Sequence, residues 1–192
     1  MNFRVVLGIT GASGQVYGLR TLQVLREIGA EVHLIVSRTA KTTMKVEGIE
    51  LKEVERMASK VYDEKDLGAS VSSGSFYHNG MIIAPCSMKT ASSIAYGITN
   101  NLISRAADVT LKEGRKLILL VRETPLHSGH LRTLLTLSEM GAVVMPPVPA
   151  FYTRPKSVED IVEYTVLRAL AMLGGEIEKI VREKLEEWKG LE

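Results

Sequence analysis

Short apolar runs alternate along the chain with longer stretches in which apolar residues recur every three or four positions. Five segments carry the apolar runs: residues 3–9, 32–36, 81–84, 116–121 and 142–145. Such near-continuous hydrophobicity is typical of parallel strands that helices cover on both faces. Helical spacing is found over residues 16–28, 39–58 with an interruption near Gly48, 88–96, 100–112, 131–140, 157–173 and 176–188. The alternation predicts an α/β fold, a Rossmann-like doubly wound parallel sheet flanked by helices.

Residues at the ends of these segments mark where elements begin and stop. Gly29 is placed to end the first helix, and Pro85 is expected to stop the third strand. Ser157 and Asp160 have the spacing of a capping box at the start of a helix. Because no internal repeat and no linker divides the chain, we expect a single domain over residues 1–192.

Two loops are distinguished by their composition. Four of the six prolines lie between Pro146 and Pro155. A proline-rich loop after a strand is stiff, and the carboxyl edge of such a sheet is where ligands of this architecture bind. The polar, glycine-bearing segment 70–80 is expected to be a mobile loop over that site or at a subunit contact.

Composition and charge argue against several classes of protein. The 24 Lys and Arg residues against 22 Asp and Glu give a net charge of +2, and aromatic residues make up 5%. Neither feature is typical of a nucleic-acid-binding surface. No apolar stretch approaches the roughly 20 residues that span a bilayer, and the first residues lack the pattern of a signal peptide. We therefore expect a cytoplasmic protein without membrane contact.

The cysteine and the histidines predict no metal site and no thiol chemistry. Cys86 is the single cysteine, so it cannot form an intramolecular disulfide. We expect it to be a small buried residue near the site rather than a nucleophile, because no histidine partner is evident. Of the four histidines, His127 and His130 are close in sequence, but no carboxylate accompanies them as a further ligand.

A glycine turn joins the first predicted strand to the first helix. Its sequence is Gly8-Ile-Thr-Gly-Ala-Ser-Gly14. Glycine lets the backbone approach a phosphate, and the helix N-terminus offers N–H groups with a favourable dipole. The alternative is a tight turn that needs glycine only for packing. The spacing matches neither the dinucleotide fingerprint nor the P-loop, because Gln15 follows where the P-loop has lysine.

The same turn is similar to that of short-chain dehydrogenases. Arg38, just past the second strand, is placed where a 2′-phosphate could bind. Tyr152 and Lys156 also have the spacing of the catalytic Tyr-x-x-x-Lys pair. That pair must share one helix face, and Pro155 between them opposes a continuous helix. The dehydrogenase interpretation fails at this point.

A second cluster of donors follows the third strand directly. Ser87, Lys89 and Thr90 bring two hydroxyls and an ammonium to the start of a helix. These donors suit a phosphate or a flavin edge, although ordinary capping by Ser87 would explain the segment on its own. Together with the glycine turn, the cluster places two anion-seeking turns in one sheet.

Five motifs then stand in register along residues 3–173. They are G-I-T-G-A-S-G-x-x-Y-G at 8–18, A-P-C-S-M-K-T at 84–90, N-L-I-S-R-A-A-D-V-x-L-K-E at 101–113, L-V-R-E-T-P-L at 120–126 and P-A-F-Y-x-R-P at 149–155. With these motifs, in this order, the chain resembles the UbiX-type flavin prenyltransferases of the homo-oligomeric flavin-containing decarboxylase-like superfamily.

The resemblance implies an enzyme that joins a dimethylallyl group from dimethylallyl phosphate to reduced FMN without a metal. The product, prenylated FMN, would serve a UbiD-type decarboxylase. The implied FMN contacts are Gly11, Ala12, Ser13, Ser37, Ser87, Met88, Lys89, Thr90 and Arg122. The implied prenyl-phosphate contacts are Lys112, Tyr152 and Arg168. The resemblance also implies a large homo-oligomer, commonly a dodecamer, with sites at subunit junctions.

The residue types in this set suit the reaction. Ionisation of an allylic phosphate leaves a delocalised cation and a phosphate dianion, which fixed donors must hold. Lys112, Arg122, Tyr152 and Arg168 would supply them. Arg168 lies in an otherwise apolar helix where an unpaired charge is costly, although an interface or snorkelling arginine is the alternative.

Closing the new ring requires a proton to leave a flavin carbon, so a base is needed. Ser13, Glu47 and Glu123 are candidates because they match family positions. Trp188 receives no role.

Two other functions remain as alternatives. A non-catalytic FMN carrier would need only the FMN contacts and would leave the prenyl-phosphate set unexplained. An FMN-dependent decarboxylase of the same superfamily would need a catalytic histidine early in the chain, and the first after the glycine turn is His33.

Overall fold

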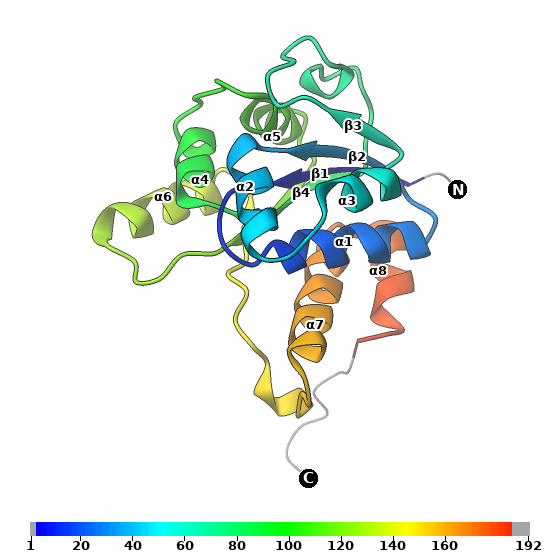
Figure 1. Ribbon diagram of the computed structural model, residues 1–192. Helices are drawn as coiled ribbons and strands as arrows, with labels where there is room; N and C mark the ends of the chain where they lie inside the picture. Colours follow the sequence, from blue (N-terminus) through cyan, green and yellow to red (C-terminus); the bar gives the residue numbers. More distant parts are fainter. Residues whose placement is uncertain (1–2, 186–192) are drawn as a thin grey trace.

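The computed structural model describes residues 3–185 and shows a central sheet covered by helices (Figure 1). The elements are β1 (Arg4–Ile9), α1 (Gln15–Glu27), β2 (Glu31–Val36), α2 (Arg38–Val46), α3 (Leu51–Met57), β3 (Lys60–Tyr62), η1 (Ser70–Ser72), β4 (Gly80–Cys86), α4 (Met88–Ala95), α5 (Leu102–Lys112), β5 (Lys116–Val121), α6 (Ser128–Glu139), β6 (Val143–Val144), η2 (Phe151–Thr153), α7 (Val158–Ala171) and α8 (Gly175–Arg182).

The six strands form one parallel sheet in the order β3-β2-β1-β4-β5-β6. From β1 the chain runs outward through β2 and β3, and it then returns to the other side of β1 with β4. The strand order therefore reverses between β1 and β4, and ligands of open α/β sheets bind outside the carboxyl ends of the strands at such a point. The predicted doubly wound parallel sheet is confirmed.

Each strand presents alternate side chains to two separate layers of helices. In β1, Val5 and Leu7 pack with α1, α7 and α8 on one face of the sheet. Val6 points to the other face, where α4, α5 and α6 supply the partners. Both faces are buried, which explains why the strands read as continuous apolar runs rather than alternating ones.

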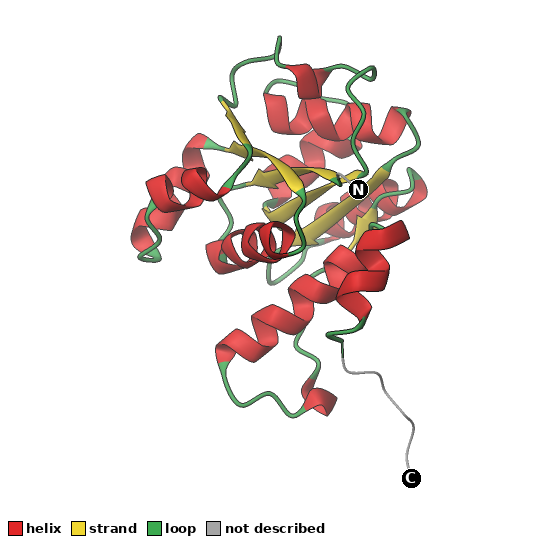
Figure 2. Cartoon of the chain, turned by 90° about the vertical axis from the view of Figure 1, so that its right-hand side faces the viewer, coloured by secondary structure: helices red, strands yellow, loops and turns green. Residues whose placement is uncertain are grey.

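One part of the chain projects from this body. The proline-bearing stretch from Pro146 to Ser157, which we call the arm, leaves β6 and carries η2 at its far end (Figures 1 and 2). The helix α7 then returns toward the sheet and packs against α1 and α8. Its start has both halves of the predicted capping box, in which Ser157 accepts from Asp160 N and Asp160 accepts from Ser157 N.

The element boundaries confirm most of the expectations and correct several. The strand at Lys116–Val121 and the helix end at Gly29, with φ 76°, are confirmed. Pro85 does not stop the third predicted strand, because β4 runs through it to Cys86 with a shift in register against β5. The edge strand β3 was not predicted, since three residues with exposed Lys60 and Val61 leave no apolar run.

Two more boundaries differ from the pattern. The helix α6 begins at Ser128 rather than at Leu131, because the imidazole of His127 accepts hydrogen bonds from two backbone N–H groups of the first turn. The last helix is described as far as Arg182, and Trp188 lies outside the described residues.

The segment 70–80 lies beside the amino ends of the strands rather than over the carboxyl edge. Asn79 N donates to Arg4 O at the start of β1, and Arg115 donates to the carbonyls of Gly74 and Phe76. A covering position over the glycine turn of the same chain is therefore wrong, and a subunit contact stays a prediction. Within residues 3–185, no helix combines the length and apolar character needed to cross a bilayer.

Candidate active site

Four of the predicted binding segments meet side by side at the carboxyl edge of the sheet. Ser37 follows β2, the Gly11–Ser13 turn follows β1, the Ser87–Thr90 segment follows β4 and Arg122 follows β5. These four strands are consecutive neighbours in the sheet. Backbone bonds join the neighbouring ends, because Ser37 N donates to Ile9 O and Arg122 N donates to Cys86 O.

The side chain of Thr10 ties the first turn to the second. Its hydroxyl donates to Pro85 O at 2.8 Å and accepts from Ser87 N at 2.8 Å, and its backbone N–H also donates to Pro85 O. Thr10 is 1% exposed, so these bonds are sheltered from water. The sequence motif contained this threonine, but its role was missed because its partners lie 75 and more positions away.

Glycine is required in the first turn by two different causes. At Gly11, an added Cβ would lie 2.4 Å from Cγ2 and 2.6 Å from Cβ of Thr39, so α2 approaches the turn too closely for any side chain. At Gly14 the backbone has φ 96°, which side chains other than hydrogen disfavour. Gly11 is thus explained by packing against α2 and Gly14 by its backbone conformation, and neither cause conflicts with a phosphate at the turn.

Glu47 closes the N-terminus of α1. Its two carboxylate oxygens accept from Gly14 N at 2.9 Å and from Gln15 N at 2.7 Å. The expectation that this helix end offers these free N–H groups to a phosphate is thus wrong for Gly14 and Gln15. An acidic group at a helix N-terminus is favourable, so Glu47 has a structural role whatever else it does. Its role as a base stays a prediction.

The predicted contacts after β4 and β2 divide into caps and exposed groups. Ser87 caps α4 by accepting from Thr90 N, and Ser37 caps α2 by accepting from Ala40 N. Met88 is 6% exposed and its side chain belongs to the core, so it can face a ligand only through its backbone. Ordinary capping by Ser87 is therefore confirmed, and flavin contact by these residues stays a prediction.

Three side chains at this edge keep unused donors. Ser13, Lys89 and Arg122 are exposed, and within the described residues no hydrogen bond or ion pair engages their side chains. A hydroxyl, an ammonium and a guanidinium in one region are the donor types that bind phosphate and carbonyl oxygens. Glu123 is also exposed and accepts from Thr124 N at 3.2 Å.

Tyr152 and Arg168 meet in a separate pocket between the arm and α7. The pocket has a volume of about 270 Å³ and is also lined by Met145, Val148 and Tyr164. Tyr152 is 46% exposed and Arg168 is exposed at the pocket wall, so the charge that looked costly from sequence is not buried in the single chain. None of the residues of the two turns lines this pocket.

Lys112 lies at the amino ends of the strands, opposite the carboxyl edge that carries Ser13, Lys89 and Arg122. It ends α5 just before β5 begins at Lys116, and its ammonium pairs with Glu113. That ion pair lowers the pKa of the Glu113 carboxyl. Because β5 has six residues and separates the edges by about 20 Å, the donor set expected from sequence is not assembled within one chain.

The residues weighed for other chemistry have structural roles, and Cys86 lies at this edge as the last residue of β4. Cys86 is fully buried, and burial raises the pKa of its thiol to about 12, as expected for a structural cysteine. His33 is 3% exposed in β2 and contacts Glu31 and Tyr62. Tyr152 and Lys156 share no helix, because Arg154 between them has φ 52°.

The fold and the edge define the class as a flavin-binding α/β protein, since the family model described as Flavoprotein matches residues 1–170. The flavin prenyltransferase UbiX of Archaeoglobus fulgidus is 57% identical over 176 residues, which are 91% of this chain and 97% of that protein. The chain belongs to the family of UbiX-type flavin prenyltransferases.

Two solved structures extend the similarity to the whole fold. A complex of AnUbiX (PadA1) with FMN and dimethylallyl pyrophosphate superposes with a TM-score of 0.94 at 42% identity and covers 100% of both chains. A dodecameric FMN-dependent UbiX-like decarboxylase from Escherichia coli O157:H7 gives 0.91 at 44% identity, covering 98% of this chain and 100% of the other.

Proposed function

We propose that this protein transfers a dimethylallyl group from dimethylallyl phosphate to reduced FMN, without a metal, and supplies the prenylated FMN to a UbiD-type decarboxylase. The observation that carries the proposal is the row of four binding turns on adjacent strand ends, in a chain that matches a complex with FMN and a dimethylallyl donor along its full length. We also place the protein in the cytoplasm.

FMN would lie along the carboxyl edge across the ends of β1 and β4. The turn at Gly11 and Ala12 has no bulky side chain, so a planar ring can approach the backbone there. Ser13, Lys89 and Arg122 would bind the phosphate and the carbonyl oxygens, since their donors are unused in the described part of the chain. The caps at Ser37 and Ser87 hold the surrounding backbone in place.

The prenyl phosphate would bind at Tyr152 and Arg168. When the carbon–oxygen bond of the allylic phosphate breaks, the electron pair leaves with the phosphate, and a guanidinium and a phenol stabilise the added charge. The dimethylallyl carbons would then bond to the electron-rich reduced flavin. The proton released on ring closure would pass to Ser13, Glu47 or Glu123, or to the departing phosphate.

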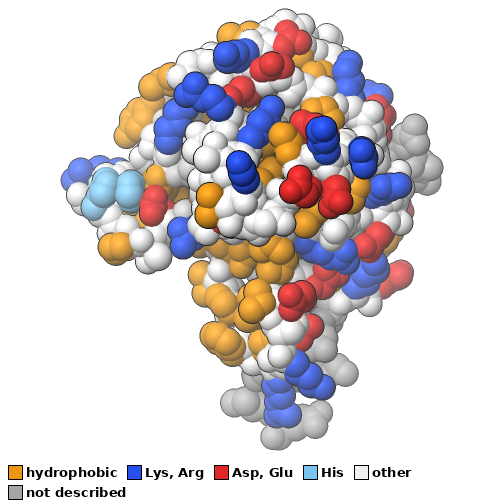
Figure 3. Space-filling model, viewed as in Figure 1, with side chains coloured by type: hydrophobic (Ala, Val, Ile, Leu, Met, Phe, Trp, Pro, Cys, Tyr) orange, Lys and Arg blue, Asp and Glu red, His pale blue; other side chains and the backbone are white. Residues whose placement is uncertain are grey.

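A homo-oligomer, a dodecamer as in the Escherichia coli relative, would complete the site. Lys112 lies about 20 Å from the carboxyl edge of its own chain, so it would serve the edge of a neighbouring copy. The arm also exposes large apolar side chains, with Val148 73% and Phe151 71% exposed, and Figure 3 shows apolar side chains gathered below the body of the molecule. Patches of this kind mark interaction surfaces.

The proposal is tested by the mass of the flavin. The protein is incubated anaerobically with reduced FMN and either dimethylallyl phosphate or dimethylallyl diphosphate, and the flavin is extracted. A mass increase by one five-carbon prenyl unit is expected. Bound FMN of unchanged mass would instead support the carrier, and release of carbon dioxide from an added acid would support the decarboxylase.

Mixed oligomers test whether Lys112 serves a neighbour. Lys112→Ala and Arg122→Ala should each have little activity alone when FMN is kept well below the Kd of the Arg122→Ala variant. Dissociating and reassembling them together should restore part of the activity, because some sites then take an intact Lys112 from one copy and an intact Arg122 from another. If mixing restores nothing while the wild-type protein recovers from the same treatment, the two residues act within one chain.

A further inference from the structure

Two tyrosine hydroxyls meet in the pocket that holds Arg168. Tyr152 comes from η2 on the arm and Tyr164 from α7, and their hydroxyl oxygens are hydrogen-bonded to each other. The rings are nearly perpendicular, at 88°, with centroids 6.0 Å apart. The sequence motifs include Tyr152 but not Tyr164, because the pairing depends on how the arm folds back along α7.

The position of Tyr164 on its helix directs it to the same site as Arg168. The two residues are four positions apart in α7 and therefore lie on one face, one turn apart. Both line the pocket of about 270 Å³ together with Tyr152. The Tyr164 ring therefore borders the space in which a ligand would contact both Tyr152 and Arg168.

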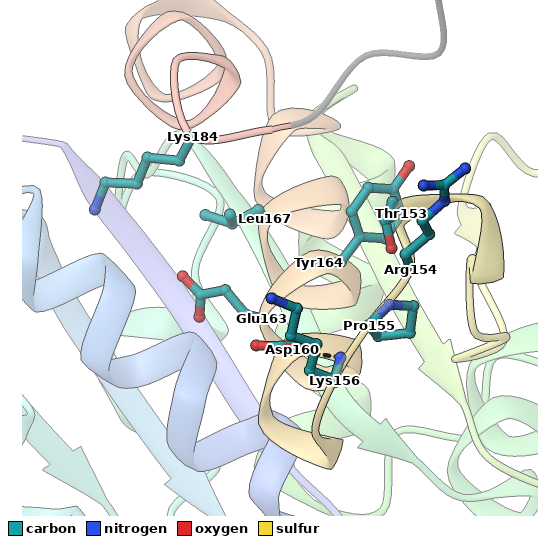
Figure 4. A pocket seen from close by; sticks show the side chains of 9 residues that line it. All are labelled: Thr153, Arg154, Pro155, Lys156, Asp160, Glu163, Tyr164, Leu167 and Lys184. Atoms are coloured by element: carbon teal, nitrogen blue, oxygen red, sulfur yellow. Dashed lines mark hydrogen bonds between the residues drawn. The ribbon is translucent and has the colours of Figure 1, made fainter.

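Tyr164 also separates this pocket from a second one on its other side. That pocket has about 370 Å³ and is lined by Thr153, Arg154 and Lys156 of the arm together with α7 residues (Figure 4). In the close-up, Tyr164 projects from α7 toward the loop of Thr153 and Arg154. The ring therefore supports the part of the arm from which Tyr152 extends.

The chemistry of a hydroxyl pair sets which way the protons point. Each hydroxyl has one proton to donate, so only one of the two can donate to the other. Burial and the bond to Tyr152 raise the pKa of Tyr164, with a smaller opposing effect of Arg168. A phosphate dianion can only accept, so Tyr152 must donate its single proton to it, and the bond between the two hydroxyls then persists with Tyr164 as the donor. The proton of Tyr152 is then directed away from Tyr164.

We propose that Tyr164 is a positioning residue for prenyl phosphate, whose hydroxyl donates to the Tyr152 oxygen and so aims the Tyr152 proton at the phosphate. This inference rests on the proposed function of the pocket. Tyr152 is 46% exposed on a single turn of η2, and the bond to Tyr164 on the longer helix α7 limits the directions of its hydroxyl. Fixing it before binding reduces the entropy lost on binding, and a donated bond also strengthens the next one in the chain.

The first test is Tyr164→Phe, which removes one oxygen and keeps the ring. KM for dimethylallyl phosphate should rise about three- to tenfold, the range of one neutral hydrogen bond, while kcat and the Kd of FMN stay as in the wild type. Tyr96→Phe is the matched control, because Tyr96 is 64% exposed at the end of α4 and lines neither pocket. An unchanged KM in Tyr164→Phe, with an active wild type, overturns the inference alone.

A double-mutant cycle separates positioning from a merely structural role. If Tyr164 acts through Tyr152, the double variant of Tyr152→Phe and Tyr164→Phe should bind dimethylallyl phosphate as weakly as Tyr152→Phe alone, and losses that add would contradict this. Calorimetric binding of dimethylallyl phosphate to the FMN-loaded oligomer gives the readout without turnover. If the wild type binds but produces no prenylated flavin, the proposed function fails while the cycle still decides the inference. Absence of binding overturns both.

Discussion

Several polar side chains at the amino edge of the sheet are buried and hydrogen-bonded, whereas three at the carboxyl edge are exposed with unused donors. At the amino edge, the buried imidazole of His33 hydrogen-bonds to Tyr62 and Glu31, and Tyr62 hydrogen-bonds in turn to Ser70. At the carboxyl edge, Ser13, Lys89 and Arg122 are exposed, and in the described part of the chain their side chains have no partner. Buried, hydrogen-bonded groups such as His33 and Tyr62 secure the fold, although the buried Nε2 of His78 at the same edge has no hydrogen-bond partner among the described residues, and exposed groups with unused donors remain for a ligand.

The carboxyl edge itself is held from beneath by buried bonds. Thr10 joins the turns after β1 and β4, and Glu47 closes the first turn of α1. The exposed donors are thus mounted on fixed backbone, which reduces the conformational entropy that binding would cost. The following predictions test this contrast between the two edges within one chain.

The largest effect is expected on the stability of the fold at low pH, through His78 at the amino edge. Burial lowers the pKa of His78 from its ordinary 6.5 to about 4. As pH falls below about 6.5 the unfolded chain binds the proton first, so stability is full above this pH and is lost toward pH 4, by about 3 kcal/mol. Denaturant unfolding between pH 7 and pH 4 measures the loss. In His78→Gln the unfolding free energy should change less between pH 7 and pH 4, and an equal pH dependence in both proteins would contradict the assignment.

Two arginines, one at each edge, should respond in opposite ways. Arg122→Ala should weaken FMN binding about 10- to 100-fold, the range for a charged hydrogen bond, and leave the unfolding free energy unchanged. Arg115→Ala should leave FMN binding unchanged and lower the unfolding free energy by about 1–2 kcal/mol, because two carbonyls of the 70–80 segment lose their donor. Flavin titration and urea unfolding give both readouts, and parallel changes in the two variants would refute the contrast.

Loss of the Thr10 hydroxyl should affect both properties. Thr10→Val leaves Ser87 N without its acceptor in a buried place, so the unfolding free energy should fall by about 2 kcal/mol and FMN binding should weaken. Thr21→Val is the matched control, since the buried Thr21 hydroxyl donates to Tyr17 O within its own helix. An equally large loss in the control would show that burial of the hydroxyl, rather than the link between turns, matters.

The smallest effect is expected at the helix cap. Glu47→Gln replaces one accepting oxygen by an amide, so the unfolding free energy should fall by about 1 kcal/mol. Glu64→Gln is its counterpart at α2, where the carboxylate accepts from Arg38 N. If thermal melting finds no measurable loss of stability in Glu47→Gln, then Glu47 does not stabilise the N-terminus of α1.

Local pattern was sufficient for elements whose signals lie close together in sequence. The strand Lys116–Val121 and the capping box at Ser157 are such cases, because burial and capping act over a few residues. Pattern failed for the polar edge strand Lys60–Tyr62, which depends on pairing with β2 rather than on its own hydrophobicity. It also misjudged Pro85, since a strand can continue through a proline where its register shifts.

The sequence by itself determined the fold class, the family and the four strand-end turns, because the alternation of strands and helices and the turn chemistry follow from short-range signals. Only the tertiary structure decided that Thr10 joins two turns, that Glu47 occupies the N-terminus of α1, and that Tyr164 bonds to Tyr152. It also decided that Lys112 lies at the far edge from Arg122. These relations concern residues that are distant along the chain or lie at opposite ends of a strand, and the folded backbone alone sets the distances between them.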